Sequence, residues 1–229
     1  MRVVAIIQAR LGSTRLPGKV VMPIVGKPMI QHVIERAQAI PGVDHVTLVV
    51  PKEDVPEFYL VRAVTGCGLT WGPRDDVLER YVLALQYSKP DVIMRITGDC
   101  PLIAPEVCQR VLEEVTQRGF VFASNDTQVE NTVRSGYPDG LDCEAFTSEL
   151  LERAHAEAAT AEDREHVTLW MRVHATSRMV VGSEGGPWPK LSVDTQADLD
   201  RVRRIMAHIP AGDYSWEATR EAIEEEGLC

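Results

Sequence analysis

No apolar run in this sequence approaches the roughly 20 residues that a transmembrane helix needs. The N-terminus lacks the basic region, apolar core and small-residue cleavage site of a signal peptide. A surplus of positive charge is missing too, since the formal net charge is −10, whereas general nucleic-acid binders are basic. We therefore expect a cytoplasmic protein with neither a membrane nor a nucleic acid among its partners.

Cysteine patterns that hold zinc or form a disulfide framework are absent as well. The five cysteines contain no C-x-x-C pair, and an odd number without paired spacing argues against both kinds of site. Two nucleotide-binding motifs are also missing. The Walker A order G-x-x-x-x-G-K-[ST] does not occur, and no G-x-G-x-x-G follows the first apolar run, which disfavours a Rossmann dehydrogenase.

Strand-like and helix-like segments alternate through the first half of the chain. Apolar runs predict strands at 3–7, 46–50, 91–97 and 120–123. Helical patterns lie between them at 28–37, 75–87 and 105–118. This alternation predicts an α/β fold, with a mostly parallel sheet covered on both faces and a single domain over residues 1–229.

The alternation breaks after Ser124. Residues 124–140 are rich in Asn, Asp, Thr, Gly and Pro, which is typical of a long loop. Beyond this loop we expect strands at 141–146, 179–181 and 191–193 and helices at 147–160, 162–174 and 198–208. The last residues, 224–229, are expected to fray.

The segment with the most chemistry is Gln8-Ala-Arg-Leu-Gly-Ser-Thr-Arg-Leu-Pro-Gly-Lys19, directly after the first predicted strand. Its Gly, Ser and Thr residues leave main-chain N–H groups able to face an anion, and Arg10, Arg15 and Lys19 supply positive charge. This arrangement suits a triphosphate held at the end of a strand.

Two more predicted strand ends carry an aspartate, Asp99 after Thr97 and Asp194 after Val193. Ligands of parallel α/β sheets bind beyond the carboxyl ends of the strands. We therefore expect the loops after Ile7, Thr97 and Val193 to share one crevice.

Three motifs resemble the cytidylyltransferases that make CMP-activated sugar acids, which include acylneuraminate, 3-deoxy-manno-octulosonate and spore-coat-polysaccharide enzymes. The loop 8–19, followed by Gly26-Lys-Pro28, is similar to their entry loop. Gly98-Asp-Cys-Pro101 is similar to a strand end with a metal-binding aspartate, and Val193-Asp-Thr-x-x-Asp-Leu199 to the second metal ligand and closing helix. The resemblance implies the Rossmann-like, three-layer α/β/α fold of nucleotide-diphospho-sugar transferases.

Two further segments look most like the spore-coat-polysaccharide branch, namely Tyr137-Pro-Asp-Gly-Leu-Asp142 and Asp163-Arg-Glu-His-Val-Thr168. The octulosonate enzymes typically carry Glu where this chain has Cys100, and they have a longer central insertion. These departures weaken any transfer of sugar specificity from the octulosonate branch.

The reaction that the resemblance implies is attack by a sugar hydroxyl on the α-phosphorus of CTP, with pyrophosphate leaving. Such transfers depend on alignment and on neutralising phosphate charge, so Arg15, Lys19 and Asp99 are the candidate catalytic residues. Asp99 and Asp194 are candidate ligands of Mg²⁺, which takes one or two carboxylates plus substrate phosphates. From the residues alone, Asp99 could instead bond its own turn, and Asp194 could cap the following helix.

The remaining candidate residues fall into two groups. Nucleotide binding is predicted for Gln8, Ala9, Arg10, Gly12, Ser13, Arg74, Thr97 and Gly98. Contact with an acidic sugar acceptor is predicted for Tyr137, Asp139, Asp142, Glu144, Arg164, Glu165 and His166. The resemblance also implies a homodimer, in which 125–175 is an inserted segment that binds the acceptor and reaches the partner.

Two other functions stay open at this point. One is a nucleotidyltransferase of the same fold with another nucleotide or alcohol. The other is a non-catalytic nucleotide-binding homologue, which the presence of Arg15, Lys19, Asp99 and Asp194 together disfavours.

Overall fold

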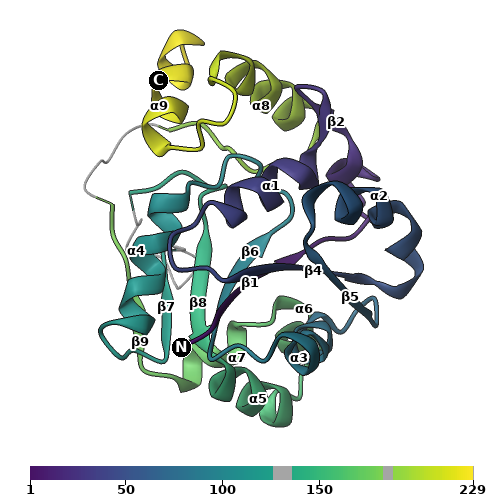
Figure 1. Cartoon of the computed structure of the whole chain (residues 1–229), viewed down its shortest axis with the longest axis vertical. Helices are drawn as coiled ribbons and strands as arrows, with labels where there is room; N and C mark the ends of the chain where they lie inside the picture. The colour runs from purple at the N-terminus through teal and green to yellow at the C-terminus, as the bar shows by residue number, and fades with distance from the viewer. Residues whose placement is uncertain (126–135, 183–187, 229) are drawn as a thin grey trace.

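A mostly parallel sheet forms the centre of the molecule (Figure 1). The computed structural model describes residues 1–125, 136–182 and 188–228, and in these residues the large sheet has seven strands in the order β5-β4-β1-β6-β8-β7-β9. The α/β class, the mostly parallel sheet and the three layers predicted from the sequence are confirmed.

Parallel strands make up one half of this sheet. They are β1 (Val3–Gln8), β4 (His45–Pro51), β5 (Gly68–Gly72) and β6 (Val92–Thr97). β1 lies between β4 and β6, and all three are nearly continuous apolar runs, as expected of strands buried on both faces. The carboxyl ends of the four strands therefore meet at one edge of the sheet.

The other half is mixed in direction. β8 (Cys143–Thr147) runs antiparallel to both β6 and β7 (Phe122–Ser124), and β9 (Ser177–Met179) pairs in parallel with β7. A separate small hairpin joins β2 (Pro23–Ile24) to β3 (Lys27–Pro28). Its turn residues Val25 and Gly26 have φ of 44° and 77°, as a two-residue hairpin of the I′ type requires.

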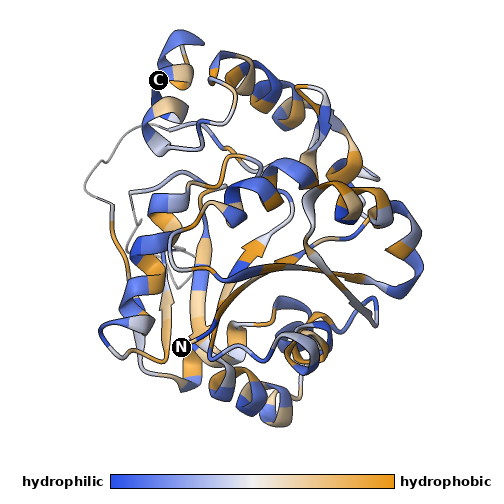
Figure 2. Ribbon diagram, viewed as in Figure 1, coloured by the Kyte–Doolittle hydropathy of each residue, from blue (hydrophilic) through white to orange (hydrophobic). Residues whose placement is uncertain are grey.

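Helices cover both faces of the sheet, whose central strands are strongly apolar (Figures 1 and 2). The helices that share the hydrophobic core on one side of the sheet are α1 (Met29–Gln38), α2 (Val55–Thr65), α4 (Pro105–Thr116), α8 (Gln196–His208) and α9 (Trp216–Glu225), of which α8 and α9 pack on each other beyond α4 and β2. The other face packs on α3 (Val77–Ser88), α5 (Ser148–Glu157) and α7 (Leu169–His174), and α6 (Ala161–His166) lies on α3. Along β1, Ala5 and Ile7 face the first group, and Val4 and Ile6 face the second.

The helix predicted over 162–174 is divided in two by a strained turn. Val167, which is fully buried, has φ 65° and ψ −53°, and the Thr168 N–H donates to the His166 carbonyl at 2.6 Å. This is a left-handed γ-turn, a rare conformation for a β-branched residue. α6 therefore ends at His166, and α7 begins at Leu169.

Other predictions about local structure need correction. The sequence analysis missed α2, β5 and α9. The segment 191–193 is not a strand, and the strand expected at 179–181 lies at Ser177–Met179. The tail expected to fray is helical to Glu225. Most of the loop predicted over 124–140 lies outside the described residues. Within the described part of the chain, no helix is both long and apolar enough to cross a bilayer.

Candidate active site

Lys19 joins the three motifs at the carboxyl edge of the sheet. Its ammonium nitrogen donates to Asp99 Oδ2 at 2.8 Å, to Asp194 Oδ1 at 3.0 Å and to the Val193 carbonyl at 2.6 Å. Gly18, with φ 69°, starts the short 3-10 turn that places Lys19 there. The predicted meeting of the loops after Ile7, Thr97 and Val193 is confirmed, because these contacts span three segments far apart in the sequence.

Asp194 is surrounded by cations. Arg15 Nη2 lies 2.8 Å from its Oδ1, and Lys190 Nζ lies 2.5 Å from its Oδ2. Burial by itself raises the pKa of the Asp194 carboxyl, but hydrogen bonds from Lys190 and Lys19 outweigh it, so the pKa lies below its ordinary value. Asp194 is therefore held ionised, and Arg15 remains largely exposed beside it.

The pair Asp99 and Asp194 fits a magnesium ion. Both carboxylates already converge on one cation, the Lys19 ammonium, and Mg²⁺ is commonly bound by one or two carboxylates together with substrate phosphates and water. Among the described residues no cluster of three or more metal-ligating side chains occurs, so this ion would depend on the nucleotide for its other ligands.

The two alternatives for these aspartates can now be judged. Thr195, not Asp194, caps α8, and its hydroxyl accepts from the Asp198 N–H while Asp198 bonds back in a capping box. The Asp99 carboxylate accepts from Lys19 and, at 3.8 Å, from the Cys100 thiol. In residues 1–125, 136–182 and 188–228, no backbone N–H of its own turn donates to the Asp99 carboxylate.

The loop that follows β1 is held in shape by its own backbone and by Asp54. The buried Asp54 carboxylate accepts from the Leu11 N–H at 2.8 Å, and Ser13 N–H and Gly18 N–H both donate to the Leu11 carbonyl. Gly12 lies directly against Arg74, since a Cβ at Gly12 would be 2.7 Å from Arg74 Nη1. The structure thus brings Arg74 to the predicted nucleotide loop, where it also pairs with Glu53 at 2.5 Å.

Gln8 is oriented by donors beneath it. Its Oε1 accepts from the Tyr81 hydroxyl at 3.1 Å and from Arg95 Nε at 3.2 Å. Because a guanidinium can only donate, this contact fixes which side of the amide is oxygen. The Gln8 amide nitrogen is therefore turned away from Arg95.

Ala9, Thr97 and Gly98 bring the ends of β1 and β6 close together. The Gly98 N–H donates to the Gln8 carbonyl at 2.9 Å, and a Cβ at Gly98 would lie 2.9 Å from that same oxygen. The Ala9 N–H donates to the Val49 carbonyl at 3.1 Å, and the Thr97 hydroxyl lies 3.1 Å from the Cys100 sulfur. Gly98 thus has a packing role at this junction.

A sequence profile described as cytidylyltransferase matches residues 4–207. The chain belongs to the cytidylyltransferase family. It is 30% identical over 213 residues to the spore coat polysaccharide biosynthesis protein SpsF of Bacillus subtilis (strain 168), covering 87% of this chain and 84% of that protein. The family resemblance in the sequence is confirmed, and so is the assignment as an enzyme.

Solved structures show the same fold. A cytidylyltransferase from Leptospira borgpetersenii matches with a TM-score of 0.89 at 24% identity, over 100% of this chain and 96% of that one. A CMP:2-keto-3-deoxy-manno-octonic acid synthetase complexed with CTP matches with a TM-score of 0.68 at 24% identity, over 90% and 99%. This cytidylyltransferase therefore keeps the overall fold of both.

Asp139, a predicted acceptor residue, is linked to Asp194 through Lys190. Its Oδ1 accepts from the Ser192 hydroxyl at 2.6 Å, and its Oδ2 lies 3.8 Å from Lys190 Nζ. Gly140 makes this approach possible, because a Cβ there would lie 2.4 Å from the Ser192 nitrogen. Asp142 Oδ2 accepts from the Gly140 N–H at 3.1 Å.

Tyr137 lies apart from Asp139 and Lys190 and packs against Arg110 of α4. Its hydroxyl accepts from Arg110 Nη1 at 2.5 Å, and the Arg110 guanidinium lies 5.9 Å from its ring centroid. No described contact joins Tyr137 to Lys19, Asp99 or Asp194.

Glu144 was predicted to contact the acceptor, but its carboxylate is buried and bound by the protein's own side chains. Strand alternation turns its side chain toward α7, where it accepts from Arg95, from Arg172 and from the Thr168 hydroxyl at 2.9 Å. Burial raises the pKa of the Glu144 carboxyl, but the charges of Arg95 and Arg172 outweigh this effect. The pKa therefore lies below its ordinary value. We call Glu144, Arg95, Arg172 and Thr168 the Glu144 cluster.

The three candidates on α6 have separate surroundings in this cytidylyltransferase. Arg164 is committed to the protein, since its Nε lies 2.5 Å from Asp76 Oδ2 and its Nη1 donates to the His155 carbonyl at 3.3 Å. Glu165 pairs with Arg10 at 3.3 Å and so bridges α6 to the nucleotide loop. His166 is exposed, at the end of the helix.

Sequence reasoning missed Asp54, Tyr81, Arg95 and Lys190 as neighbours of this site. Lys190 lies four residues before Asp194. This spacing predicts an ion pair in a helix, but it does not in an irregular segment. Arg95 sits in an apolar strand run, and a charged residue there was the one signal that could have suggested a buried partner.

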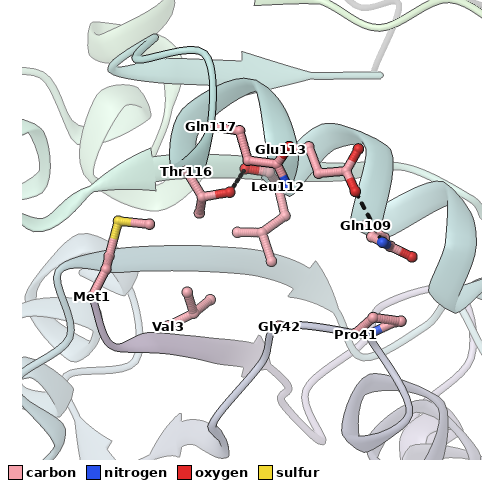
Figure 3. Close-up of a pocket in the computed structure, with 9 residues that line it drawn as sticks. All are labelled: Met1, Val3, Pro41, Gly42, Gln109, Leu112, Glu113, Thr116 and Gln117. Carbon is pink, nitrogen blue, oxygen red and sulfur yellow. Dashed lines mark hydrogen bonds between the residues drawn. The ribbon is translucent and has the colours of Figure 1, made fainter.

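A separate cleft lies at the opposite edge of the sheet (Figure 3). It has a volume of about 340 Å³ and is lined by Met1, Pro41, Gly42 and residues of α4 such as Leu112 and Thr116. Because Val3 begins β1 and Met1 precedes it, this cleft lies at the amino end of the strand and is not continuous with the Lys19 contacts.

Proposed function

We propose that this chain transfers CMP from CTP to a sugar acid and releases pyrophosphate, with Mg²⁺ as cofactor. The observation that carries the proposal is the convergence of Lys19, Asp99 and Asp194. The names of the relatives support the nucleotide and the acceptor class, since one is a synthetase of a CMP-activated sugar acid complexed with CTP. SpsF is named for spore coat polysaccharide biosynthesis, which supports a role in surface polysaccharide or glycoconjugate biosynthesis.

The cationic and the acidic residues have different roles in the proposed reaction. Arg15 and Lys19 neutralise the β- and γ-phosphates, a guanidinium gripping two oxygens and an ammonium acting as a compact charge. Asp99 and Asp194 hold the magnesium ion, which when bound polarises the α-phosphate. We assign backbone N–H groups of the loop after β1 to alignment of the triphosphate. We assign Asp139 to the acceptor side, together with Lys190, whose ammonium links Asp139 to Asp194.

In this arrangement Arg15 changes partners when CTP binds, and Lys19 keeps its place. Arg15 is 62% exposed at its side chain, so it can turn from Asp194 to a phosphate without unpacking the core. Lys19 is nearly buried and already fixed by the Val193 carbonyl. We therefore assign Lys19 to alignment and Arg15 to closure on the phosphates.

The first experiment compares CTP, UTP, GTP and ATP by thermal shift, each with and without Mg²⁺. Ligand that binds only the folded chain raises its apparent stability by mass action. We expect the largest shift with CTP plus Mg²⁺.

Pyrophosphate release is then measured with CTP, Mg²⁺ and a set of 3-deoxy and acylamino sugar acids, with neutral sugars as controls. A shift confined to GTP or UTP contradicts the assignment of CTP, and no shift with any nucleotide contradicts the enzymatic proposal.

A further inference from the structure

Asp194 has a cation on each of its two carboxylate oxygens. Its Oδ1 lies 3.0 Å from Lys19 Nζ and 2.8 Å from Arg15 Nη2, and its Oδ2 lies 2.5 Å from Lys190 Nζ. Among the residues that the structure describes, Oδ2 accepts from Lys190 alone. A magnesium ion is bound through such oxygens, and like charges this close together repel each other. The binding of magnesium to Asp194 therefore requires at least one of these cations to move.

The three cations differ in how firmly the protein holds them. The Lys19 side chain is 9% exposed and makes two further hydrogen bonds with the protein. Arg15 is largely exposed and lies on Oδ1 of Asp194. The Lys190 side chain is 33% exposed, and it has a second carboxylate within reach, since Asp139 Oδ2 lies 3.8 Å from its Nζ. Lys190 is therefore the cation that can leave Asp194 and still have a carboxylate beside it.

Main-chain hydrogen bonds hold the segment around Lys190 without help from its ammonium. The Leu191 N–H donates to the Asp139 carbonyl at 2.7 Å. The Val193 N–H donates to the Asp99 carbonyl at 2.9 Å. Because lysine has a flexible four-carbon stem, its ammonium can turn while the main chain stays fixed by these bonds. Movement of the ammonium therefore leaves the segment in place.

Asp139 is positioned to receive the Lys190 ammonium. Its Oδ1 accepts from the Ser192 hydroxyl at 2.6 Å, and its Oδ2 is the oxygen that approaches Lys190. The Asp139 side chain is 56% exposed, so an ammonium held there remains accessible to a ligand. An ammonium has three N–H donors and no acceptor, so one carboxylate leaves donors for a second anion. Lys190 beside Asp139 thus offers a binding position for an acidic ligand.

We propose that Lys190 couples the metal site to the acceptor. When Mg²⁺ binds, the Lys190 ammonium leaves Asp194 Oδ2, moves to Asp139 and binds the carboxylate of the sugar acid. The inference rests on the proposed function and adds an order to it, in which magnesium and CTP bind before the acidic acceptor. Because the coupling between two binding sites is reciprocal, an acid held by Lys190 also strengthens the binding of the metal.

The first test measures the metal alone, with Mn²⁺ as a paramagnetic substitute for Mg²⁺ and no nucleotide present. Lys190→Met removes the cation that competes for Asp194 Oδ2, so we expect electron paramagnetic resonance to show Mn²⁺ bound on the order of 10-fold more tightly. Arg204→Met is the matched control, because Arg204 also pairs with an 18% exposed carboxylate, that of Glu226 at 2.9 Å. This control removes the same charge, and its Mn²⁺ affinity should equal that of the parent.

The second test measures the acceptor side, with the sugar acids that support pyrophosphate release by the parent chain. In Lys190→Met we expect the KM for the acid to rise on the order of 10- to 100-fold, with a smaller change in kcat and no loss of CTP affinity. Lys190→Arg keeps the positive charge and should restore most of the affinity for the acid. Lys190→Gln is a second uncharged variant and should behave as Lys190→Met does. Thermal unfolding of each variant checks that it is folded.

Two results overturn the inference and leave the proposed function standing. One is an Mn²⁺ affinity in the folded uncharged variants that equals that of the parent or of Arg204→Met. The other is an unchanged KM for the acid in these variants. If the parent releases pyrophosphate with no sugar acid, the proposed function fails instead, and the Mn²⁺ comparison still decides whether Lys190 competes with the metal.

Discussion

The carboxyl edge of the sheet carries two ionic groups of similar composition and opposite character. In the Lys19 contacts, the side chains of Asp99 and Asp194 are 29% and 18% exposed. In the Glu144 cluster, the carboxylate is 2% exposed, with a guanidinium on each side. Carboxylates and cations thus form one open group, the Lys19 contacts, which a ligand can reach. They also form one closed group, the Glu144 cluster, in which the carboxylate is bound by side chains of the protein. Exposure, rather than residue type, separates a binding role from a structural one.

The largest expected effect is on the open group. Asp99→Asn removes one of two carboxylates that face the cation position, so we expect turnover to fall on the order of 1,000-fold or more, about 4 kcal/mol of transition-state stabilisation. The fold should be intact, because Asp99 is partly exposed and its backbone carbonyl still accepts from the Val193 N–H. Pyrophosphate release and thermal unfolding are measured together. Normal turnover in this variant would remove Asp99 from the metal site.

The closed group should respond in the opposite way. Glu144→Ala leaves Arg95 and Arg172 buried beside a cavity, and losing one partner of a buried ion pair destabilises a protein by about 3 kcal/mol. Urea unfolding of the variant measures this loss. Glu144→Gln keeps the shape and serves as the control, with a smaller loss expected. If the Glu144→Ala variant unfolds at the same urea concentration as the parent chain, the cluster is not structural.

Acid should affect both groups more weakly. The pKa values of Asp194 and Glu144 lie below their ordinary values in the folded chain, so each stabilises the fold fully above the unfolded pKa near 4 and loses this contribution as pH falls through the folded pKa. The free energy of unfolding should therefore drop between pH 7 and pH 3, and the contribution of Asp194 should be the smaller one because solvent screens it. Asp194→Asn should flatten this part of the curve, and an unchanged slope would contradict the depressed pKa.

Much of the open group could be predicted from the sequence, and the physical reason is simple. Parallel strands end at one edge, so polar residues after Gln8 and Thr97 must meet. Val193 does not end a strand, and it reaches this edge because its N–H donates to the Asp99 carbonyl at 2.9 Å. The closed group could not be predicted in this way. Whether Glu144 faces solvent or α7 depends on how β8 pairs with its neighbours and on where α6 and α7 pack. The residues around Glu144 in the sequence predict neither of these.

Two of the elements that the sequence analysis missed, α2 and β5, have a weak hydrophobic pattern. α2 leaves Leu60 and Val64 exposed, so its apolar residues do not form a single stripe, and β5 is a five-residue edge strand with a glycine at each end. The burial of Arg80 on α3 had no signal either, because an arginine on an amphipathic helix normally reaches solvent. Its burial follows from Gly72, which lets the stem of Arg80 pack against β5.

The left-handed turn at Val167 has a consequence for the order of folding. The local sequence favours one continuous helix, as the pattern over 162–174 predicts, and a valine with φ 65° is unfavourable until its neighbours hold it. Those neighbours are distant in the chain, Asp76 bonding Arg164 and Glu144 bonding Thr168. We therefore expect the turn to form late, after the sheet and α3 have assembled, so that the Glu165–Arg10 pair is among the last contacts to form.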